Sequence, residues 1–448
     1  MNSKPLGLLL ILPNVAQKDL TSKVEKVWNQ LQEVLATHKL NIPIYFTFED
    51  FEKSKMYDDL KNEHKKKLDG TADGNIFTRK LLTLEVKAAD PVLTPSLELP
   101  VLYGTFKSDE EIRNTNKPLI LITASSDFLT IAPGMSRGIN SASGMMAVYD
   151  ISRYFSQLLE DPKLKESAEF DFMFALTPGS WMNYELSGQF IESLNDKIKE
   201  RISFIISLDS LAYADDMTFY FGNMNSKESK FAKEVLQLMR ESSSKFNKNI
   251  KFNKKPSPGN FYEWEHLRFS EKGISFAGTL TSYKNVTFEN QYEKFSVFDT
   301  EDNFDAAAYE INIKIITDFL AKLILPSIKR DERFIKDDAT LVDFKNQTQF
   351  INFLTSNQRI PTKMVTNSKI VLELQQMMKL SIKNTKVRKI RVNNPKFYDD
   401  TPVVQRMKYY RAGSQIYNIF YYGAIVGSLV AVYYLLKRLF SRRKVKKS

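Results

Sequence analysis

Apolar and polar positions form regular blocks through the middle of the chain. Short apolar runs with the length of buried strands occupy residues 118–124, 170–176, 202–208 and 217–221. Helix-period patterns lie between or after them at residues 145–159, 184–194, 228–243 and 304–325. Strands that alternate with helices predict an α/β fold with a mostly parallel sheet sandwiched between helices. We assign this predicted core to residues 76–326.

The pattern on either side of this core is different. The strand-like runs LGLLLILP and NIPIYFTF flank a helix-period stretch at residues 20–35, which predicts a small N-terminal α/β unit over residues 1–75. A highly charged helix is expected at residues 51–68. Residues 81–86 and 101–106 are candidate strands of one antiparallel pair. Residues 327–415 are predicted to form a helical, basic connector, because residues 342–383 are rich in Lys and show no β-alternation.

A 21-residue segment without a charge follows the connector at residues 416–436. It is apolar on all sides, carries tyrosines at both ends and has the length that a bilayer requires, so we expect a transmembrane helix. Residues 437–448 contain seven Lys or Arg, which predicts a cytosolic tail. The large domain would then lie in a lumen. No N-terminal signal is visible, so either leading sequence is missing or the large domain is cytosolic and tail-anchored.

Charge and composition narrow the function class. The formal net charge is +11, but residues 359–448 hold 20 Lys or Arg against 3 Asp or Glu, so the rest of the chain is acidic. A basic excess beside an apolar span is typical of contact with anionic lipid and argues against a nucleic-acid-binding fold. The chain has no Cys, which excludes disulfides and thiol chemistry, and only three His, at positions 38, 64 and 266.

Polar motifs gather at the predicted strand ends, where functional residues of open α/β sheets are found. They are TASSD at residues 123–127, RGINSASG at 137–144, FALTPGSWMNYELSG at 174–188 and SLDSLAY at 207–213. None is a nucleophile elbow or a phosphate-binding loop. Two zinc ions need a bridging carboxylate, terminal imidazoles or carboxylates and a carboxylate base. Asp127 and Asp209 cannot supply that set, and an isolated His266 favours a structural role.

These motifs and their order resemble the co-catalytic zinc aminopeptidase superfamily that includes the nicastrins and nicalins. The resemblance implies an aminopeptidase-like fold whose metal site has been lost. Its vestigial ligand positions are Ser125 in place of a His, Asp127, Asn140 in place of a bridging Asp, and Asp209. Residues 177–180 contain no Glu pair, and residues 278–285 contain no late His. Asp127 is therefore expected to cap a turn or to hydrogen-bond the remodelled loop, and we predict a pseudoenzyme with no catalytic residue, metal or other cofactor.

Within the superfamily the chain is most similar to the nicalin family. The matching stretches are LLLILP with IPIYFTFED, WEHLRF at residues 264–269, FLTSNQR at 353–359 and NPKFYDD at 394–400. The resemblance implies a single-pass, non-enzymatic subunit of an endoplasmic reticulum membrane complex, the BOS complex, with a lumenal large domain. Implied partners are a Nodal modulator-like lumenal protein, a multi-spanning membrane protein, the protein-conducting channel and the lipid bilayer, and no nucleic acid. The implied role is to assist insertion of multi-pass membrane proteins.

Two other functions remain open at this stage. One is a nicastrin-like subunit that gates substrates of an intramembrane protease, and the other is a membrane-anchored aminopeptidase. Nicalins begin with a signal peptide, so the resemblance also implies that this chain is truncated at its N-terminus. Candidate glycosylation sites are Asn285 and Asn346, and Lys444 and Lys446 fit a Lys-x-Lys-x-x retrieval signal.

Overall fold

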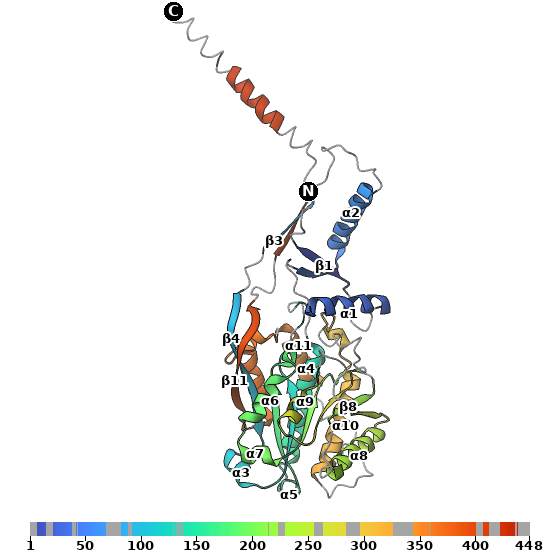
Figure 1. The fold of residues 1–448 in the computed structure, drawn as a ribbon, viewed down its shortest axis with the longest axis vertical. Coiled ribbons are helices and arrows are strands. Elements are labelled where there is room, and N and C mark those ends of the chain that lie inside the picture. Colours follow the sequence, from blue (N-terminus) through green and yellow to red (C-terminus); the bar gives the residue numbers. More distant parts are fainter. Residues whose placement is uncertain are drawn as a thin grey trace, which may run out of the picture. The chain divides into compact units, whose positions relative to one another are not determined.

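The computed structural model describes most of the chain in two compact units. The first unit comprises residues 1–10, 15–46 and 92–399, and the second comprises residues 11–14, 47–91 and 400–448 (Figure 1). Described residues are 7–14, 21–37, 42, 44–68, 82–87, 92–128, 130, 132, 135, 138–213, 215–222, 229–254, 263–283, 296–325, 344–357, 359–399, 406–411, 422–434 and 437.

An eight-stranded sheet forms the centre of the first unit, in the order β11-β4-β6-β5-β7-β10-β8-β9. Its strands are β4 (Val92–Thr105), β5 (Leu119–Ser125), β6 (Asp171–Thr177), β7 (Ile202–Leu208), β8 (Met217–Phe221), β9 (Ile250–Asn253), β10 (Ala277–Thr281) and β11 (Lys386–Asp399). The four central strands β6, β5, β7 and β10 are parallel. Antiparallel pairs join β4 to β6 and to β11, and β8 to β10. The sheet is therefore mixed, with four parallel strands in the middle and a further parallel pair, β8 and β9, at one edge.

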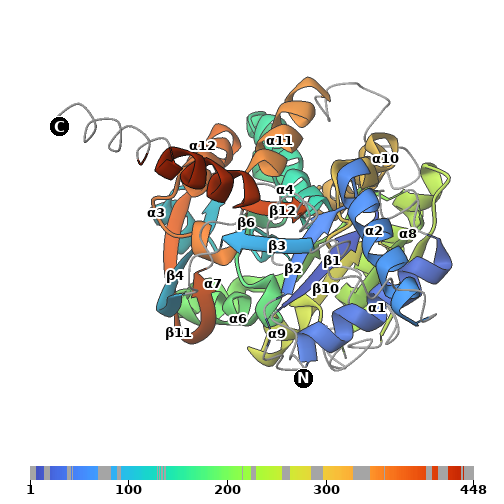
Figure 2. The same cartoon turned by 90° about the horizontal axis from the view of Figure 1, so that it is seen from above.

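Helices cover both faces of this sheet. The connection from β5 to β6 contains α4 (Ile139–Leu158), and the connection from β6 to β7 contains α6 (Glu185–Ser193) and α7 (Asp196–Arg201). Because β6 and β7 lie on opposite sides of β5, right-handed crossovers place α4 and α6 on opposite faces. Figure 2 shows α4 on one side of the sheet and α6 on the other.

The remaining helices extend these two layers. Together with α4 lie α8 (Ser229–Lys245), α10 (Ala306–Ile324), α11 (Phe344–Ser356) and α12 (Lys369–Ser381), while α9 (Glu265–Glu271) packs against α6. Short helices α3 (Asp109–Asn114) and α5 (Pro162–Ser167) lie at the amino ends of β5 and β6. Every residue of β5 and β6 is buried, as expected for strands covered on both faces. The predicted α/β sandwich is confirmed in this coarse form.

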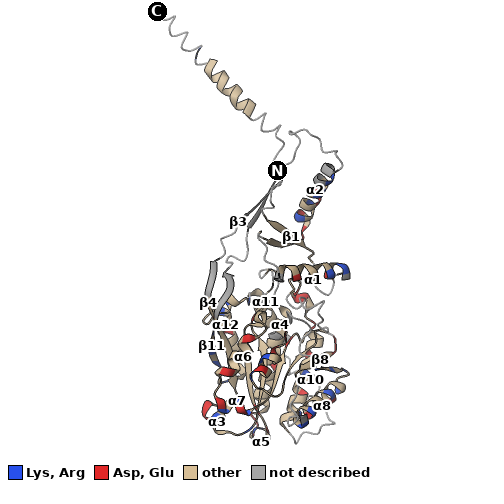
Figure 3. Ribbon diagram, viewed as in Figure 1, with Lys and Arg blue, Asp and Glu red and all other residues tan. Residues whose placement is uncertain are grey.

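The N-terminal elements are β1 (Leu8–Leu12), α1 (Ser22–Thr37) and β2 (Ile44–Phe48), in the order that the pattern predicts. The two strands pair as a small sheet of their own. The charged helix α2 (Phe51–Leu68) follows, and it carries both Lys and acidic residues along its length (Figure 3). The boundary at residue 75 stays a prediction.

The predicted pairing of residues 81–86 with 101–106 is wrong. β3 (Leu82–Lys87) pairs antiparallel with β12 (Arg406–Arg411), which lies more than three hundred residues later in the chain. The second predicted strand belongs to β4, which starts at Val92 and joins the large sheet. Sequence proximity favoured the wrong partner because an alternating pattern does not encode which strand it pairs with.

The helical prediction for the connector at residues 327–415 is correct for α11 and α12 but wrong for β11 and β12. β11 is an edge strand of the large sheet, with Ile390 and Val392 buried against the core. Its outward positions carry Lys and Arg, including Lys389, which pairs with Glu98 of β4 at 3.1 Å. Charged outward residues are typical of edge strands. Here they obscured the two-residue period.

Among the helices that the structure describes, none is both long and apolar enough to cross a membrane. Residues 422–434 of the predicted span are helical, and their large apolar side chains are exposed. Residues 416–421 and 435–436 of that span lie outside the described residues.

Candidate functional site

The predicted vestigial positions meet at one edge of the sheet. Ser125 ends β5, Asp127 follows it, Asp209 follows β7, and Asn140 lies in the first turn of α4. Because β5, β6, β7 and β10 are parallel, their carboxyl ends open onto the same edge. The side chain of Asn140 lies outside the described residues, as does His38. The other three predicted side chains are buried.

Asp127 is surrounded by hydrogen-bond donors. Its Oδ2 accepts from the backbone N–H of Gly179 at 2.8 Å and from the indole N–H of Trp181 at 2.9 Å. Its Oδ1 accepts from the backbone N–H of Ser180 at 3.2 Å, with the hydroxyls of Ser180 and Ser125 at 3.1 and 3.3 Å. A carboxylate offers about four acceptor positions, so this one has none left for a metal ion. This is the hydrogen-bonding role expected of Asp127.

The donors belong to the loop after β6, which contains residues 177–180, the segment in which the sequence lacks a Glu pair. Gly179 has φ 100°, a conformation that favours glycine, and it turns the chain so that successive N–H groups point at Asp127. Burial raises the pKa of Asp127, while the N–H groups of Gly179 and Ser180 act to lower it. The loop after β6 thus holds Asp127 through hydrogen bonds within the chain.

Asp209 is also engaged by neighbouring hydroxyls. It accepts from Ser210 Oγ at 2.9 Å and from Tyr184 Oη at 3.3 Å. Tyr184 and Ser210 both have positive φ, at 60° and 54°, which is uncommon for residues other than glycine. Such strained residues cluster at functional sites, and here they lie beside the second retained acid.

Arg359 is a buried cation at this edge that the sequence did not reveal. It is 3% exposed and reaches back from the connector to the strand-end loops. Its guanidinium donates to the carbonyl of Ser126 at 3.3 Å and to the carbonyl of Gly138, and its own carbonyl accepts from the N–H of Phe128 at 2.9 Å. It therefore ties together the loop after β5 and the start of α4.

Electrostatics explain why this arginine stays charged. Burial lowers the pKa of Arg359 to about 10, while the carboxylates of Asp299 and Asp127 act to raise it. A buried charge needs a partner of opposite sign. One arginine thus supplies positive charge close to Asp299 and Asp127.

A third buried carboxylate, Glu265, lies at the start of α9. Its oxygens accept from Thr177 Oγ1 and Ser187 Oγ, both at 2.6 Å, and from Thr123 Oγ1 at 2.9 Å. Burial raises the pKa of Glu265, and these hydroxyls oppose the shift. The sequence motif WEHLRF identified the segment but gave no sign that its Glu is a structural centre between β5, β6 and α6.

His266, next to Glu265, is buried against β10. Its Nδ1 lies 3.1 Å from Thr279 Oγ1, and burial lowers its pKa to about 3, so the ring is neutral. Within residues 278–285, the range expected for a late His, the Ser282 hydroxyl donates to the Ser210 carbonyl at 2.9 Å and accepts from the Tyr213 N–H at 3.0 Å. In the described part of the chain, no three His, Cys, Asp or Glu residues are placed to bind one metal ion.

Four other predicted positions cannot be placed. Asn285, Lys444 and Lys446 lie outside the described residues, and Asn346 lies in α11 with its side chain undescribed.

Comparison with known proteins gives the fold. No protein-family model and no curated protein matches the sequence. Among solved structures, nicastrin, a component of gamma-secretase, matches 83% of this chain and 79% of its own with a TM-score of 0.53 and 13% identity. The chain has the fold of nicastrin.

Zinc aminopeptidases also match, over shorter spans. A zinc aminopeptidase from Bacillus subtilis aligns with a TM-score of 0.35, 14% identity and 53% coverage of each chain. An aminopeptidase from Aneurinibacillus sp. strain AM-1 aligns with a TM-score of 0.33, 18% identity and coverage of 53% of this chain and 50% of its own. The chain thus spans about half the length of these two enzymes.

Proposed function

We propose that this protein is a non-enzymatic, nicalin-like subunit of an endoplasmic reticulum membrane complex that associates with the protein-conducting channel and assists insertion of multi-pass membrane proteins. The observation that carries the non-enzymatic part is the saturation of Asp127 by donors from Gly179, Ser180, Trp181 and Ser125. A metal ion would have to displace these buried hydrogen bonds, each costly to lose.

The membrane part of the proposal is supported by the sequence. Residues 416–436 carry no charge and precede a tail with seven basic residues, so we propose one span with the tail in the cytosol and the large domain in the lumen. The described part of this segment is helical, and its large apolar side chains are exposed. Lipid is the environment that suits such a helix.

Partner recovery tests the proposal directly. The native protein is captured by antibody from digitonin-solubilised microsomes and its partners are identified by mass spectrometry. We expect a long lumenal protein, a multi-spanning protein and channel subunits, and we expect none of them in a matched capture of an unrelated single-pass protein. Recovery without channel subunits or a multi-spanning protein would contradict the proposal.

A second candidate is a nicastrin-like subunit that gates substrates of an intramembrane protease, and the match with nicastrin favours it. The same capture distinguishes the two functions, because this candidate requires a polytopic aspartyl protease among the partners. The third candidate, a membrane-anchored aminopeptidase, is disfavoured by the donors around Asp127.

Topology has its own test. When the full native transcript is expressed, a lumenal domain permits a glycan at Asn285 that an endoglycosidase removes, with a matching increase in gel mobility. An Asn285→Gln variant is the control that should lack this glycan. A large domain accessible to protease in sealed microsomes would overturn the lumenal placement.

A further inference from the structure

A cavity of about 370 Å³ lies at the amino end of β6, on the opposite edge of the sheet from Asp127. Its wall comes from the chain after β4, from α4 and α5, from β6 and from the turn after α12. Cavities of this size accept small organic ligands, usually through apolar walls and a few oriented polar groups.

Aromatic rings form much of the wall. Phe106, Phe170 and Phe172 all line the cavity. The rings of Phe106 and Phe172 meet edge to face with centroids 6.3 Å apart, which fixes their orientation. The cavity is thus suited to an aromatic or apolar ligand body.

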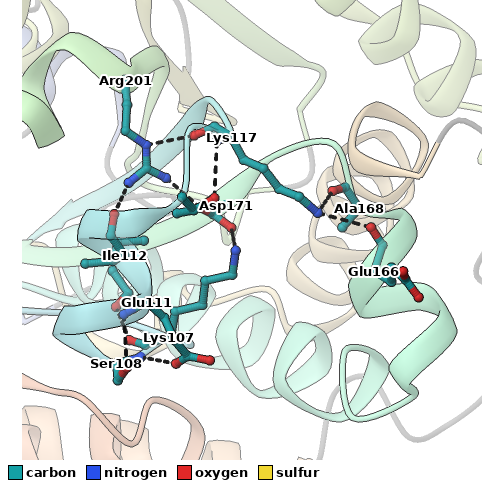
Figure 4. Close-up of polar contacts among 11 residues, drawn as sticks. Lys107, Ser108, Glu111, Ile112, Lys117, Glu166, Ala168, Asp171 and Arg201 are labelled. Atoms are coloured by element: carbon teal, nitrogen blue, oxygen red, sulfur yellow. Dashed lines mark hydrogen bonds and ion pairs between the residues drawn. The ribbon is translucent and has the colours of Figure 1, made fainter.

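Positive charge exceeds negative charge around the cavity. Three Lys, at positions 107, 165 and 383, line it together with Asp171 and Glu160. Asp171 is already paired with Lys107 at 2.6 Å and with Arg201 at 2.5 Å, so its carboxylate lies between two cations (Figure 4). Within the described part of the chain, neither Lys165 nor Lys383 has a carboxylate within ion-pair distance, and the charge of Lys165 contributes only at longer range to lowering the pKa of Glu111. These two ammonium groups are available to an anion.

The turn that carries Lys383 is held firmly in place. Ser381 shares a hydrogen bond of 2.7 Å with Ser152 of α4, and the Asn384 amide donates to the Lys107 carbonyl at 2.7 Å. Gly104 of β4 lies so close to Ile382 that no side chain would fit there. A charged group on a fixed turn loses little freedom on binding, which favours a ligand.

We propose that this cavity binds an organic anion, a carboxylate or phosphate on an aromatic or apolar body. The anionic group meets Lys165 and Lys383, and the body lies against Phe106 and Phe172. Lys is a common binder of phosphate as a point charge, and the aromatic wall provides the apolar contact. This proposal is independent of the function proposed above.

Calorimetry with a defined probe tests it. The full chain is embedded in phosphatidylcholine nanodiscs and titrated with 1-naphthyl phosphate, with inorganic phosphate and 1-naphthol as ligands that carry only the charge or only the body; empty nanodiscs give the blank. We expect naphthyl phosphate to bind at least about tenfold more tightly than either. Equal affinity for 1-naphthol would overturn the role of the lysines, and equal affinity for phosphate would overturn the role of the wall.

Variants separate the two parts of the site. Lys165→Gln with Lys383→Gln should weaken naphthyl phosphate binding about tenfold or more, because charge-assisted contacts are lost. Both lysines are exposed, so folding should be kept. The matched control, Lys230→Gln with Lys233→Gln on the exposed side of α8, should bind like the wild type. Unchanged affinity in the first double variant contradicts the proposal.

Ser156 lines the cavity from α4, and Ser156→Phe should fill it without removing charge. Loss of naphthyl phosphate binding in this variant supports a ligand inside the cavity, and retained binding contradicts it. Competition by monomeric dihexanoyl phosphatidic acid separates the sources: displacement indicates a lipid headgroup, and no displacement indicates a small soluble anion.

Discussion

Each of the two edges of the central sheet contains a buried aspartate, and the two aspartates have different kinds of partner. At the carboxyl edge, Asp127 accepts hydrogen bonds from neutral N–H and hydroxyl donors, with the charge of Arg359 nearby. At the amino edge, Asp171 is paired directly with two cations beside an open cavity. The carboxyl edge is internally satisfied, whereas among the described residues of the amino edge Lys165 and Lys383 have no ion-pair partner. Side chains whose hydrogen bonds are all made within the chain contribute to stability. Charged side chains without an ion-pair partner are available to bind a ligand.

The largest test of this difference is removal of the cation at the carboxyl edge. Arg359→Met leaves Asp299 and Asp127 buried without their opposite charge, and it should lower the free energy of unfolding by about 3–5 kcal/mol. Urea unfolding followed by tryptophan fluorescence measures this, with Trp181 as a local reporter. The control Arg388→Met, at an exposed position of β11, should cost less than about 1 kcal/mol.

A double substitution tests whether Arg359 neutralises the charge of Asp299. Asp299→Asn in the Arg359→Met background should restore part of the loss, because it removes one of the uncompensated charges. If the two losses simply add, Arg359 does not neutralise Asp299.

The two aspartates can then be compared directly. Asp127→Asn forces an amide N–H₂ against the N–H groups of Gly179 or Ser180, so it should cost about 2–3 kcal/mol. Asp171→Asn releases Lys107 and Arg201, which are partly exposed, and should cost only about 1 kcal/mol. Equal losses in urea unfolding would remove the distinction between the edges.

The sequence predicted the centre of the fold because β5, β6 and β7 are uninterrupted apolar runs buried on both faces. It missed β11 because Lys and Arg on its outward positions hid the alternation of Ile390 and Val392. The pairing of β3 with β12 depends on a contact across most of the chain, which no local pattern encodes.

The candidate site was predicted in part. Strand ends and missing ligand types located Ser125, Asp127 and Asp209. Arg359 was missed because one arginine in a basic connector looks like a solvated charge. Glu265 was missed because its environment is built from hydroxyls at positions 123, 177 and 187, which come together only in the folded chain.

The dependence of stability on pH should show how well His266 is shielded from water. His266 has a folded pKa of about 3, below its ordinary value of 6.5, so the unfolded chain takes up a proton that the folded chain refuses. Stability should therefore be lost as the pH falls from about 6.5 towards 3, by up to about 1.4 kcal/mol per pH unit from this residue. His266→Gln should remove that part of the slope, whatever it does to stability at neutral pH. Parallel curves for the two proteins would show that His266 is open to water.

The smallest expected effect is the response to zinc, and it bears most directly on the loss of metal chemistry. A ligand that binds only the folded state at a hundred times its Kd stabilises it by about 2.7 kcal/mol, which is readily visible as a rise in Tm. Asp127 has no free acceptor position, Ser125 is a hydroxyl donor to Asp127, and Asp209 is engaged by Ser210 and Tyr184. We therefore expect no change in Tm when zinc is added in excess to the chelator-treated chain, and an identical result for Asp209→Asn. A rise in Tm that disappears in Asp209→Asn would instead place a working metal site at the carboxyl edge and make the two edges alike in binding.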